Sequence, residues 1–349
     1  TLGALLDPLG AGAAIPPAAD QTRRLFRIAQ FIPQALAGLG REAPRGAALL
    51  RMAQEIGRAI DRLLVEDIDP EALWQERVTQ VLAEMSGHWI ENTQLFYAVQ
   101  QMWRAELHAR GELDAAARRN RLFAHAAERW RAQPPATPVV AAGVTSAAPA
   151  LAQLLRVISE LPEGAVILPD LDLSMPAEVW DELGHAGAAD ADPPLARGDA
   201  VTHPQYHLKL LLNRMGVARG EVQPWHRAGL GKGPPERSHA ISSLFLPPEA
   251  SKAWVDLPAD KRRLSGVRLI ETANPEEEAQ AIALLVRQTL AEPEQRVAVV
   301  TPDRGLARRV IHHLRRWNIE ADDSAGRPLS QTTAGRLFLL LAEACAEQA

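Results

Sequence analysis

Two segments of the chain combine an apolar run with a polar turn and a helical pattern, a layout that α/β proteins use to bind phosphates. They are Val139–Ser146 and Val297–Arg304. A motor ATPase of this layout carries a metal-holding carboxylate after the first of these runs. Here Ala142 and Gly143 stand where the acids would be. The pattern therefore predicts the shape of a motor without its chemistry, as in a scaffold or a DNA-contacting module.

The loops after the predicted strands supply candidates for binding DNA. Ligands of parallel sheets gather at the carboxyl ends of the strands, and helices that begin there aim free backbone N–H groups at the same edge. Arg304 could contact a phosphate and Tyr206 could stack on a base. A Tyr206 packed on its own helix and an Arg304 that is a plain surface charge suit the sequence equally well. The predicted DNA-facing residues are Thr145, Ser146, His203, Gln205, Tyr206, Asp303 and Arg304.

Arginine is concentrated in three further places, within residues 23–27, 118–121 and 308–316. Each cluster could grip phosphate, and each could equally be a solvated helix face. We favour the solvated face, because arginine on exposed helices needs no ligand to explain it.

The remaining polar residues predict neither a metal site nor a catalytic constellation. The single cysteine, Cys345, excludes an internal disulfide and a cysteine-based zinc site. Gly229–Gly233 resembles a phosphate loop, but it lacks Ser or Thr after its lysine and follows no strand. His312 and His313 are adjacent on a helix, so their side chains point in different directions and cannot share a metal. We expect no cofactor, no metal ion and no active site in this chain.

The chain has 349 residues and a net charge of −5. The length suits two or three domains, and the acidity means that any DNA contact must come from a local basic patch. No stretch reaches the ~18 apolar residues that span a membrane, and no signal peptide is present. We therefore expect a cytoplasmic protein without a membrane contact. Both ends of the sequence resemble cuts, and we expect a piece of a larger protein.

A change of hydrophobic period at Pro134 and Pro135 marks a predicted boundary. Upstream, from Asp20 to about Arg131, apolar residues recur with a helical period, which predicts about four to six helices. Downstream, short apolar runs alternate with helical patterns, which predicts a parallel sheet. Buried strands are predicted at Val139–Val144, Val166–Leu168 and Val297–Val300, and shorter ones at Leu269–Ile270 and from Ile319.

Capping patterns predict where several helices begin. Asp69–Glu71 and Asn274–Glu277 each combine a capping side chain, a proline and acids in the first turn. Asp114 and Ser330 are predicted to cap two further helices, and Tyr206–Met215 is predicted to be a short helix.

The stretches of sequence that are most specific for a family resemblance are Ala115–Phe123, Ala127–Arg131, Val140–Ser146, His203–Tyr206, Val300–Val310, Arg316–Ile319 and Asp322–Leu329. In this order they resemble the AddB family, in its alphaproteobacterial form. Its members are the second subunits of bacterial AddAB helicase–nucleases, which process DNA double-strand breaks. The resemblance runs over nearly the whole chain.

The resemblance implies an α/β fold of degenerate UvrD-type, helicase-like RecA-like domains with a large all-helical insertion domain. Residues 1–135 would be the helical insertion of the first RecA-like domain, and residues 136–265 the remainder of that domain. Residues 266–330 would start the second RecA-like domain, and residues 331–349 a further helical insertion. Thr301 would stand where active relatives place a phosphate-contacting arginine.

The resemblance also implies a non-catalytic role in break repair. This part would guide single-stranded DNA, dock on an AddA-like motor subunit and take part in recognising the Chi sequence, in an enzyme that also meets double-stranded DNA. The parent subunit would be an exonuclease in an ATP-dependent helicase–nuclease complex, and its iron–sulfur cluster and magnesium would belong to a nuclease domain outside this sequence.

Two other hypotheses stay open. One is a Rossmann-like nucleotide-sugar or nucleoside-phosphate enzyme, against which neither α/β segment has a glycine-rich loop between strand and helix. The other is an assembly scaffold without DNA contact.

Overall fold

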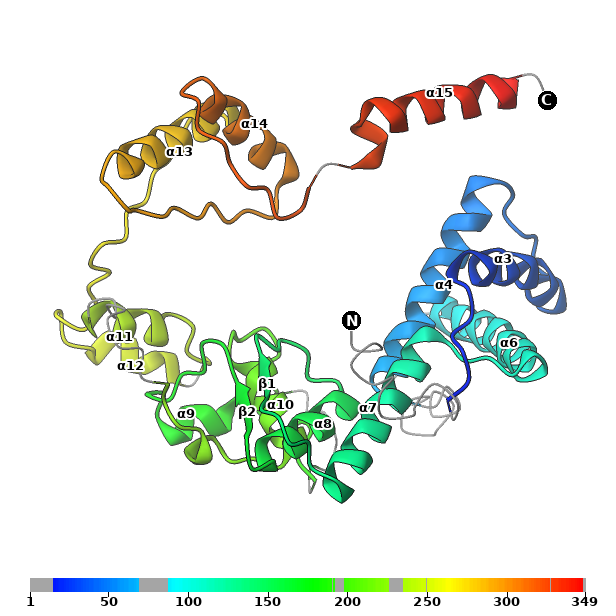
Figure 1. Cartoon of the computed structure of the whole chain (residues 1–349), viewed down its shortest axis with the longest axis horizontal. Coiled ribbons are helices and arrows are strands. Elements are labelled where there is room, and N and C mark those ends of the chain that lie inside the picture. Colours follow the sequence, from blue (N-terminus) through cyan, green and yellow to red (C-terminus); the bar gives the residue numbers. More distant parts are fainter. Residues whose placement is uncertain are drawn as a thin grey trace. The chain divides into compact units, whose positions relative to one another are not determined.

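The computed structural model describes residues 15–68, 87–189, 191, 198–225, 235–248, 250–326 and 328–347, and most of these residues are helical. The chain divides into two compact units, Thr1–Ser265 and Gly266–Ala349 (Figure 1). Among the described residues, three hydrophobic clusters lie in the first unit and one lies in the second. The predicted helix start at Asp69–Glu71 and the loop Gly229–Gly233 lie outside the described residues.

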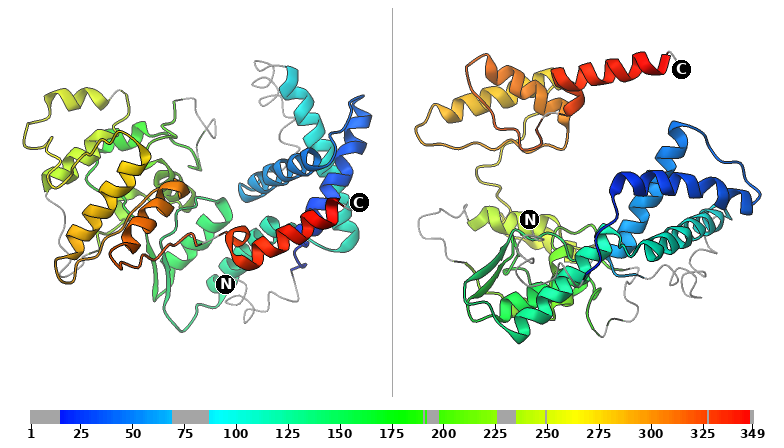
Figure 2. Two further views of the ribbon diagram at one scale, coloured as in Figure 1. Left: turned by 90° about the horizontal axis from the view of Figure 1, so that it is seen from above. Right: turned by 45° about the vertical axis from the view of Figure 1, so that its right-hand side comes forward.

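Long helices open the first unit, and Figure 2 shows how they lie. Three of them share one apolar core. α3 contacts both α4 and α6, and Ile28, Ile32, Ile60 and Trp103 are fully buried among them. The helical period predicted for this region is confirmed. The helices of this region are α3 (Gln21–Gly38), α4 (Ala47–Val65), α6 (Gly87–Arg110) and α7 (Ala115–Ala132).

α7 begins after Asp114, the predicted cap, but the Asp114 side chain makes no capping hydrogen bond. Its carboxylate instead accepts a hydrogen bond from Trp103 Nε1 at 3.0 Å and lies 3.1 Å from Arg24 Nε. Burial raises the pKa of Asp114, and the charge of Arg24 opposes that rise. The predicted cap therefore serves a buried contact that joins the start of α7 to α3 and α6.

Two parallel strands follow α7, β1 (Val139–Ala142) and β2 (Gly164–Ile167), and they pair in register along their whole length. The connecting helix α8 (Pro149–Glu160) begins with proline in its first turn. It contacts both strands, α7 and helix α10 (Tyr206–Met215), as Figure 1 shows. The predicted parallel arrangement and the predicted bounds of α10 are confirmed. The sheet of the described residues has these two strands alone, so RecA-like domains stay a prediction.

The rest of the first unit is organised around the short helix α9 (Ala177–Glu182). Buried Lys209 donates through Nζ to the backbone oxygens of Trp180 at 2.6 Å and Asp181 at 3.3 Å. A cation at the carboxyl end of a helix complements the helix dipole. Lys209 Nζ and the Arg219 guanidinium also lie over the Trp180 ring, 5.6 and 4.9 Å from its centre. The other elements here are η3 (Arg219–Glu221), α11 (Pro235–Leu244), η4 (Ala250–Lys252) and α12 (Ala253–Asp256).

The second unit is built on a pair of packed helices. The pair buries Ala279, Ala283, Val310 and Leu314 at its contact. Its elements are α13 (Pro275–Leu290), α14 (Arg304–Arg315), η5 (Leu329–Gln331) and α15 (Thr333–Glu347).

Two helices of this unit test the predicted caps. The Asn274 side-chain oxygen accepts hydrogen bonds from the N–H groups two and three residues later, at 3.1 and 2.9 Å, which confirms the predicted start of α13. The predicted cap Ser330 is wrong. It lies in η5, and Thr332 Oγ1 instead accepts from the Gly335 N–H at 3.0 Å at the start of α15.

The strands predicted in this unit are also wrong. Leu269–Ile270, Val297–Val300 and Ile319 lie in extended or irregular chain without strand pairing. Leu269 is 86% exposed and Val300 is 93% exposed. A strand forms only where a neighbour accepts its backbone hydrogen bonds. Among the described residues no ladder reaches these segments, while α13 and α14 bury their apolar faces on each other.

Candidate phosphate-binding site

Helix α14 has two opposite faces that follow from its residue spacing. Its apolar face carries Val310 and Leu314, which are buried against α13. Residues three, four and seven apart share a face of a helix. Arg304, Arg308 and Arg315 therefore gather on the side opposite the core.

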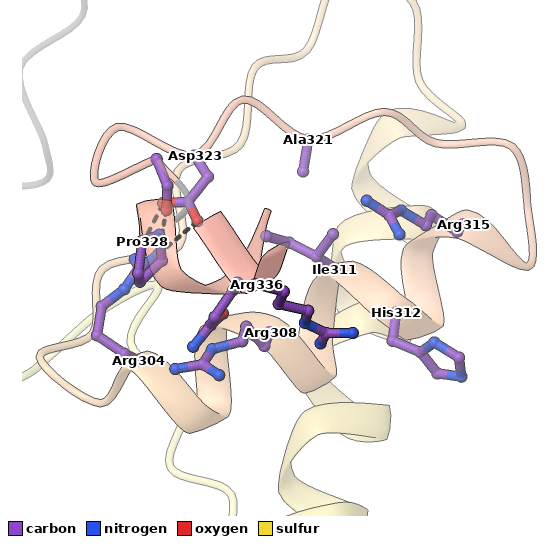
Figure 3. Close-up of a pocket in the computed structure, with 11 residues that line it drawn as sticks. Arg304, Arg308, Ile311, His312, Arg315, Ala321, Asp323, Pro328 and Arg336 are labelled. Atoms are coloured by element: carbon purple, nitrogen blue, oxygen red, sulfur yellow. Dashed lines mark hydrogen bonds and ion pairs between the residues drawn. The ribbon is translucent and has the colours of Figure 1, made fainter. Parts of the chain in front are cut away.

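These arginines line a hollow of about 500 Å³ beside α14, which we call the arginine hollow (Figure 3). A fourth arginine, Arg336, enters it from α15. Asp323 supplies the one carboxylate of the lining, so basic groups outnumber acidic ones. The full lining is Arg304, Arg308, Ile311, His312, Arg315, Ala321, Asp323, Gly326, Pro328, Gln331 and Arg336.

Arg304 is already engaged by the protein. Its NH1 and NH2 groups donate to the two carboxylate oxygens of Asp323 at 2.9 and 2.6 Å, and NH2 also donates to the Gly326 backbone oxygen at 3.1 Å. The hydrogen bond from Arg304, helped by the Ala325 backbone N–H, lowers the pKa of Asp323. The same pairing raises the pKa of Arg304. Arg304 therefore ties the loop to α14, and its charge is neutralised.

The other three arginines of the hollow differ from Arg304. Arg308, Arg315 and Arg336 are exposed, and no ion pair or hydrogen bond joins any of their side chains to another described residue. Their guanidinium groups carry a permanent charge and only donate hydrogen bonds. The hollow thus suits an oxyanion such as phosphate.

His312 and His313 diverge, as their adjacency predicts. His312 is exposed and lines the hollow. His313 is buried, and its Nε2 lies 2.7 Å from the Glu276 carboxylate at the start of α13. Only the first of the two histidines is placed to meet a ligand of the hollow.

The predicted site residues next to α14 serve its start. The Asp303 side chain caps the helix by accepting from the Gly305 N–H at 2.6 Å. Thr301 Oγ1 accepts from the Asp303 N–H at 3.1 Å. Asp303 does not line the arginine hollow, so its described role is structural.

In the first unit, Thr145 and Ser146 are exposed just beyond the carboxyl end of β1, as predicted for loop residues at that edge. Ala142 is the last residue of β1, and Gly143 follows at φ +69°. A positive φ is easy for glycine and strained for other residues, so Gly143 serves the turn. The β1 edge presents hydroxyl groups and no acid at these positions.

His203, Gln205 and Tyr206 are used to build the start of α10. His203 Nδ1 accepts from the Gln205 N–H at 3.0 Å, and the Gln205 side chain donates to Asp170 O and accepts from Asp172 N, both at 2.9 Å. Tyr206 is 5% exposed. The expectation that Tyr206 stacks on a base is not met in this conformation, because its ring packs inside the protein.

Asp172, at the same edge of the sheet, is occupied by the protein. One carboxylate oxygen accepts from Ser174 N and Ser174 Oγ at 2.9 and 2.7 Å, and from Met175 N at 3.1 Å. The other accepts from Ser242 Oγ. These bonds lower the pKa of Asp172 although its burial acts in the opposite direction. The carboxylate therefore fastens α11 to the loop after β2.

The arginine cluster at residues 23–27 is neither a solvated face nor a phosphate grip. Arg23 pairs with Glu112, and Arg27 pairs with Glu106. Buried Arg24 pairs with Asp61 at 2.8 Å and with Asp114 at 3.1 Å. The prediction of a solvated helix face is wrong for this cluster. It could not foresee the ion pairs, because each partner comes from a distant part of the sequence. In the cluster at residues 118–121, Arg118 Nε donates to Pro16 O at 3.1 Å.

Arg336 is the functional candidate that sequence reasoning missed. It is one of the few charged residues in an otherwise apolar helix, a signal that could have drawn attention to it. The spacing of Arg308 and Arg315 was visible in the sequence, but the approach of α15 was not.

No family model, no curated protein and no solved structure matches this chain. Among the described residues, no helix combines the length and apolar character needed to cross a membrane. The same part of the chain holds no group of three or more His, Cys, Asp or Glu side chains placed to bind a metal ion.

Proposed function

We propose that this chain is the non-motor, DNA-handling part of a double-strand break repair subunit of the AddB type, and that it holds single-stranded DNA while an AddA-like partner drives it. The observation that carries the proposal is the arginine hollow, in which arginines of two helices surround one cavity with a single carboxylate. The resemblance of the sequence stretches supplies the repair context.

The charge of the chain makes a local site necessary. At a net charge of −5 the chain has no overall attraction for DNA. The arginines of α14 concentrate positive charge on one helix face, where phosphate contacts give most of the sequence-independent affinity for nucleic acid. The Ala142 and Gly143 positions at the end of β1 supply no metal-holding acid, which supports a holding role rather than a driving one.

Docking on a partner has separate support. α15 exposes five consecutive apolar side chains, Leu337–Leu341. Exposed apolar patches of this kind commonly mark protein–protein contacts. An AddA-like motor subunit is the partner that the proposed role requires.

The experiment is fluorescence anisotropy of the 349-residue chain with a labelled single strand. We expect a Kd of roughly 10⁻⁴–10⁻⁶ M that weakens steeply with salt. Arg308→Glu reverses a charge in the hollow, and Arg316→Glu makes the same change at the C-cap residue of the same helix, outside the lining. Arg308→Glu should weaken binding at least tenfold more than Arg316→Glu.

Equal losses in the two variants would show a general charge effect and contradict the assignment to the hollow. Absence of strand binding by the unaltered chain at low salt would contradict the proposed function itself.

A further inference from the structure

We infer that the arginine hollow takes the sugar–phosphate backbone of an extended single strand through Arg308, Arg315 and Arg336, and that it leaves the bases unread. The inference rests on the proposed function for its choice of nucleic acid. It differs from the sequence-based expectation, which placed a phosphate contact on Arg304 and favoured a solvated face for the arginines at residues 308–316.

The positions of the charges favour a polymer over a single phosphate. Arg308 and Arg315 are two helical turns apart, and a rise of 1.5 Å per residue separates their Cα atoms by about 10 Å along the axis of α14. Arg336 approaches from α15. Charges spread along a helix contact successive phosphates of a chain, whereas an isolated phosphate is held by donors that converge on one point.

The lining also lacks the means to distinguish bases by stacking. Its one aromatic side chain among the described residues is that of His312, and stacking on an aromatic face tolerates every base. Trp317, the nearest tryptophan in the sequence, is half-buried with the Arg287 guanidinium 4.9 Å from its ring centre. Contacts to phosphate alone position a strand without reading its sequence.

Asp323 acts as a built-in competitor for phosphate. Its carboxylate occupies both donor groups of the Arg304 fork, at 2.9 and 2.6 Å. Asp323→Asn removes the negative charge, while its side-chain oxygen still accepts the Ala325 N–H bond that spans 3.1 Å in the native loop. The variant thus frees the charge of Arg304, and the hydrogen bonds from the Ala325 N–H and from Arg304 to the Gly326 backbone oxygen remain to hold the loop.

The test is a salt titration of the full chain against labelled single strands of oligo-dT, oligo-dA and mixed sequence. Three phosphate contacts predict a slope of log Kobs against log salt of about −2, at about 0.7 per contact for single strands. Affinities for the three strands should agree within about threefold. Arg308→Ala/Arg315→Ala/Arg336→Ala should abolish most of the slope, and Arg316→Ala should leave it unchanged. Asp323→Asn should tighten binding and steepen the slope by about 0.7.

The outcomes separate a failure of the inference about the hollow from a failure of the proposed function. Strand binding with a native slope in the triple variant overturns the inference and leaves the proposed function standing, with the strand on another surface. A preference above tenfold for one sequence, or weaker binding by Asp323→Asn, overturns the inference in the same way. Absence of strand binding by the unaltered chain overturns both. Circular dichroism of each variant confirms that the helices of the second unit are retained.

Discussion

Arg304 and Asp323 form a two-point ion pair in which both guanidinium donors meet both carboxylate oxygens, at 2.9 and 2.6 Å. The pair joins the first residue of α14 to the loop before α15. An arginine that looks in the sequence like a phosphate ligand is therefore used to shape the wall of the site.

Replacing Arg304 by lysine should loosen this loop without unfolding α14. Lysine keeps the charge but loses the planar two-point fork. We expect faster amide hydrogen exchange at Ala325, whose N–H bonds to Asp323, and unchanged exchange at Val310 in the core. Native exchange at Ala325 in the lysine variant would mean that the fork does not hold the loop.

The buried pairing of Arg24 predicts a large loss of stability on truncation. The side chains of Arg24 and Asp114 are 5% and 6% exposed. Removing one partner of a buried pair costs about 3–5 kcal/mol, because the other charge stays buried. Arg24→Ala should lower the free energy of unfolding of the first unit by about that amount in urea titrations.

The matched control is Arg58→Ala. Arg58 pairs with Glu55 across exposed side chains at 63% and 68%, and exposed pairs contribute about 0–1 kcal/mol. Similar losses for both variants would show that the burial of Arg24 is unimportant to stability.

Local signals explain why part of the fold was predictable. Asn274 and the proline after it determine where α13 begins, and both lie next to that start in the sequence. Helix α10 has the predicted bounds Tyr206–Met215. Capping and helical period depend on neighbours in the sequence. Strand pairing does not, which is why β1 and β2 formed as expected while the apolar run Val297–Val300 did not.

The arginine hollow was likewise predictable only in part from the sequence. The basic face of α14 follows from the spacing of Arg308 and Arg315. The pairing of Arg304 with Asp323 and the position of Arg336 in the lining depend on contacts between distant residues of the second unit. The ion pairs of Arg24 were not predicted for the same reason, because its partners Asp61 and Asp114 lie far away in the sequence.

Two carboxylates of the helical region should shift stability with pH in opposite directions. The hydrogen bond from Arg27 lowers the pKa of Glu106, so its contribution is present above its unfolded pKa of about 4.3 and is lost as the pH falls through the lowered value. Burial raises the pKa of Asp114. Its contribution is present below the unfolded pKa of about 3.9 and is lost as the pH rises through the raised value.

Urea midpoints measured between about pH 3 and pH 7 test these signs. Glu106→Gln should flatten the loss of stability toward acid. Asp114→Asn should remove the component that declines as the pH rises. The same pH profile in the native chain and in both variants would exclude these two groups as its source.

Gly184 is a position where a single methyl group should destabilise the first unit. Its backbone has φ +111°, and a Cβ there would lie 2.0 Å from the Asp199 Oδ1 atom. The backbone conformation alone costs a non-glycine residue about 1–3 kcal/mol, and the contact with Asp199 adds to that. Gly184→Ala should therefore lower the free energy of unfolding by at least this amount in urea titrations.

Two further variants separate the causes at Gly184. A Cβ at Gly220 meets no atom within 4 Å, and Gly220 does not have a positive φ, so Gly220→Ala should change stability by less than about 0.5 kcal/mol. Asp199→Ala in the Gly184→Ala background removes the two closest contacts, with Oδ1 at 2.0 Å and Cγ at 2.5 Å, but keeps the unfavourable φ, so it should restore only part of the loss. Full restoration would assign the whole cost to the contact with Asp199, and equal effects of Gly184→Ala and Gly220→Ala would contradict both causes.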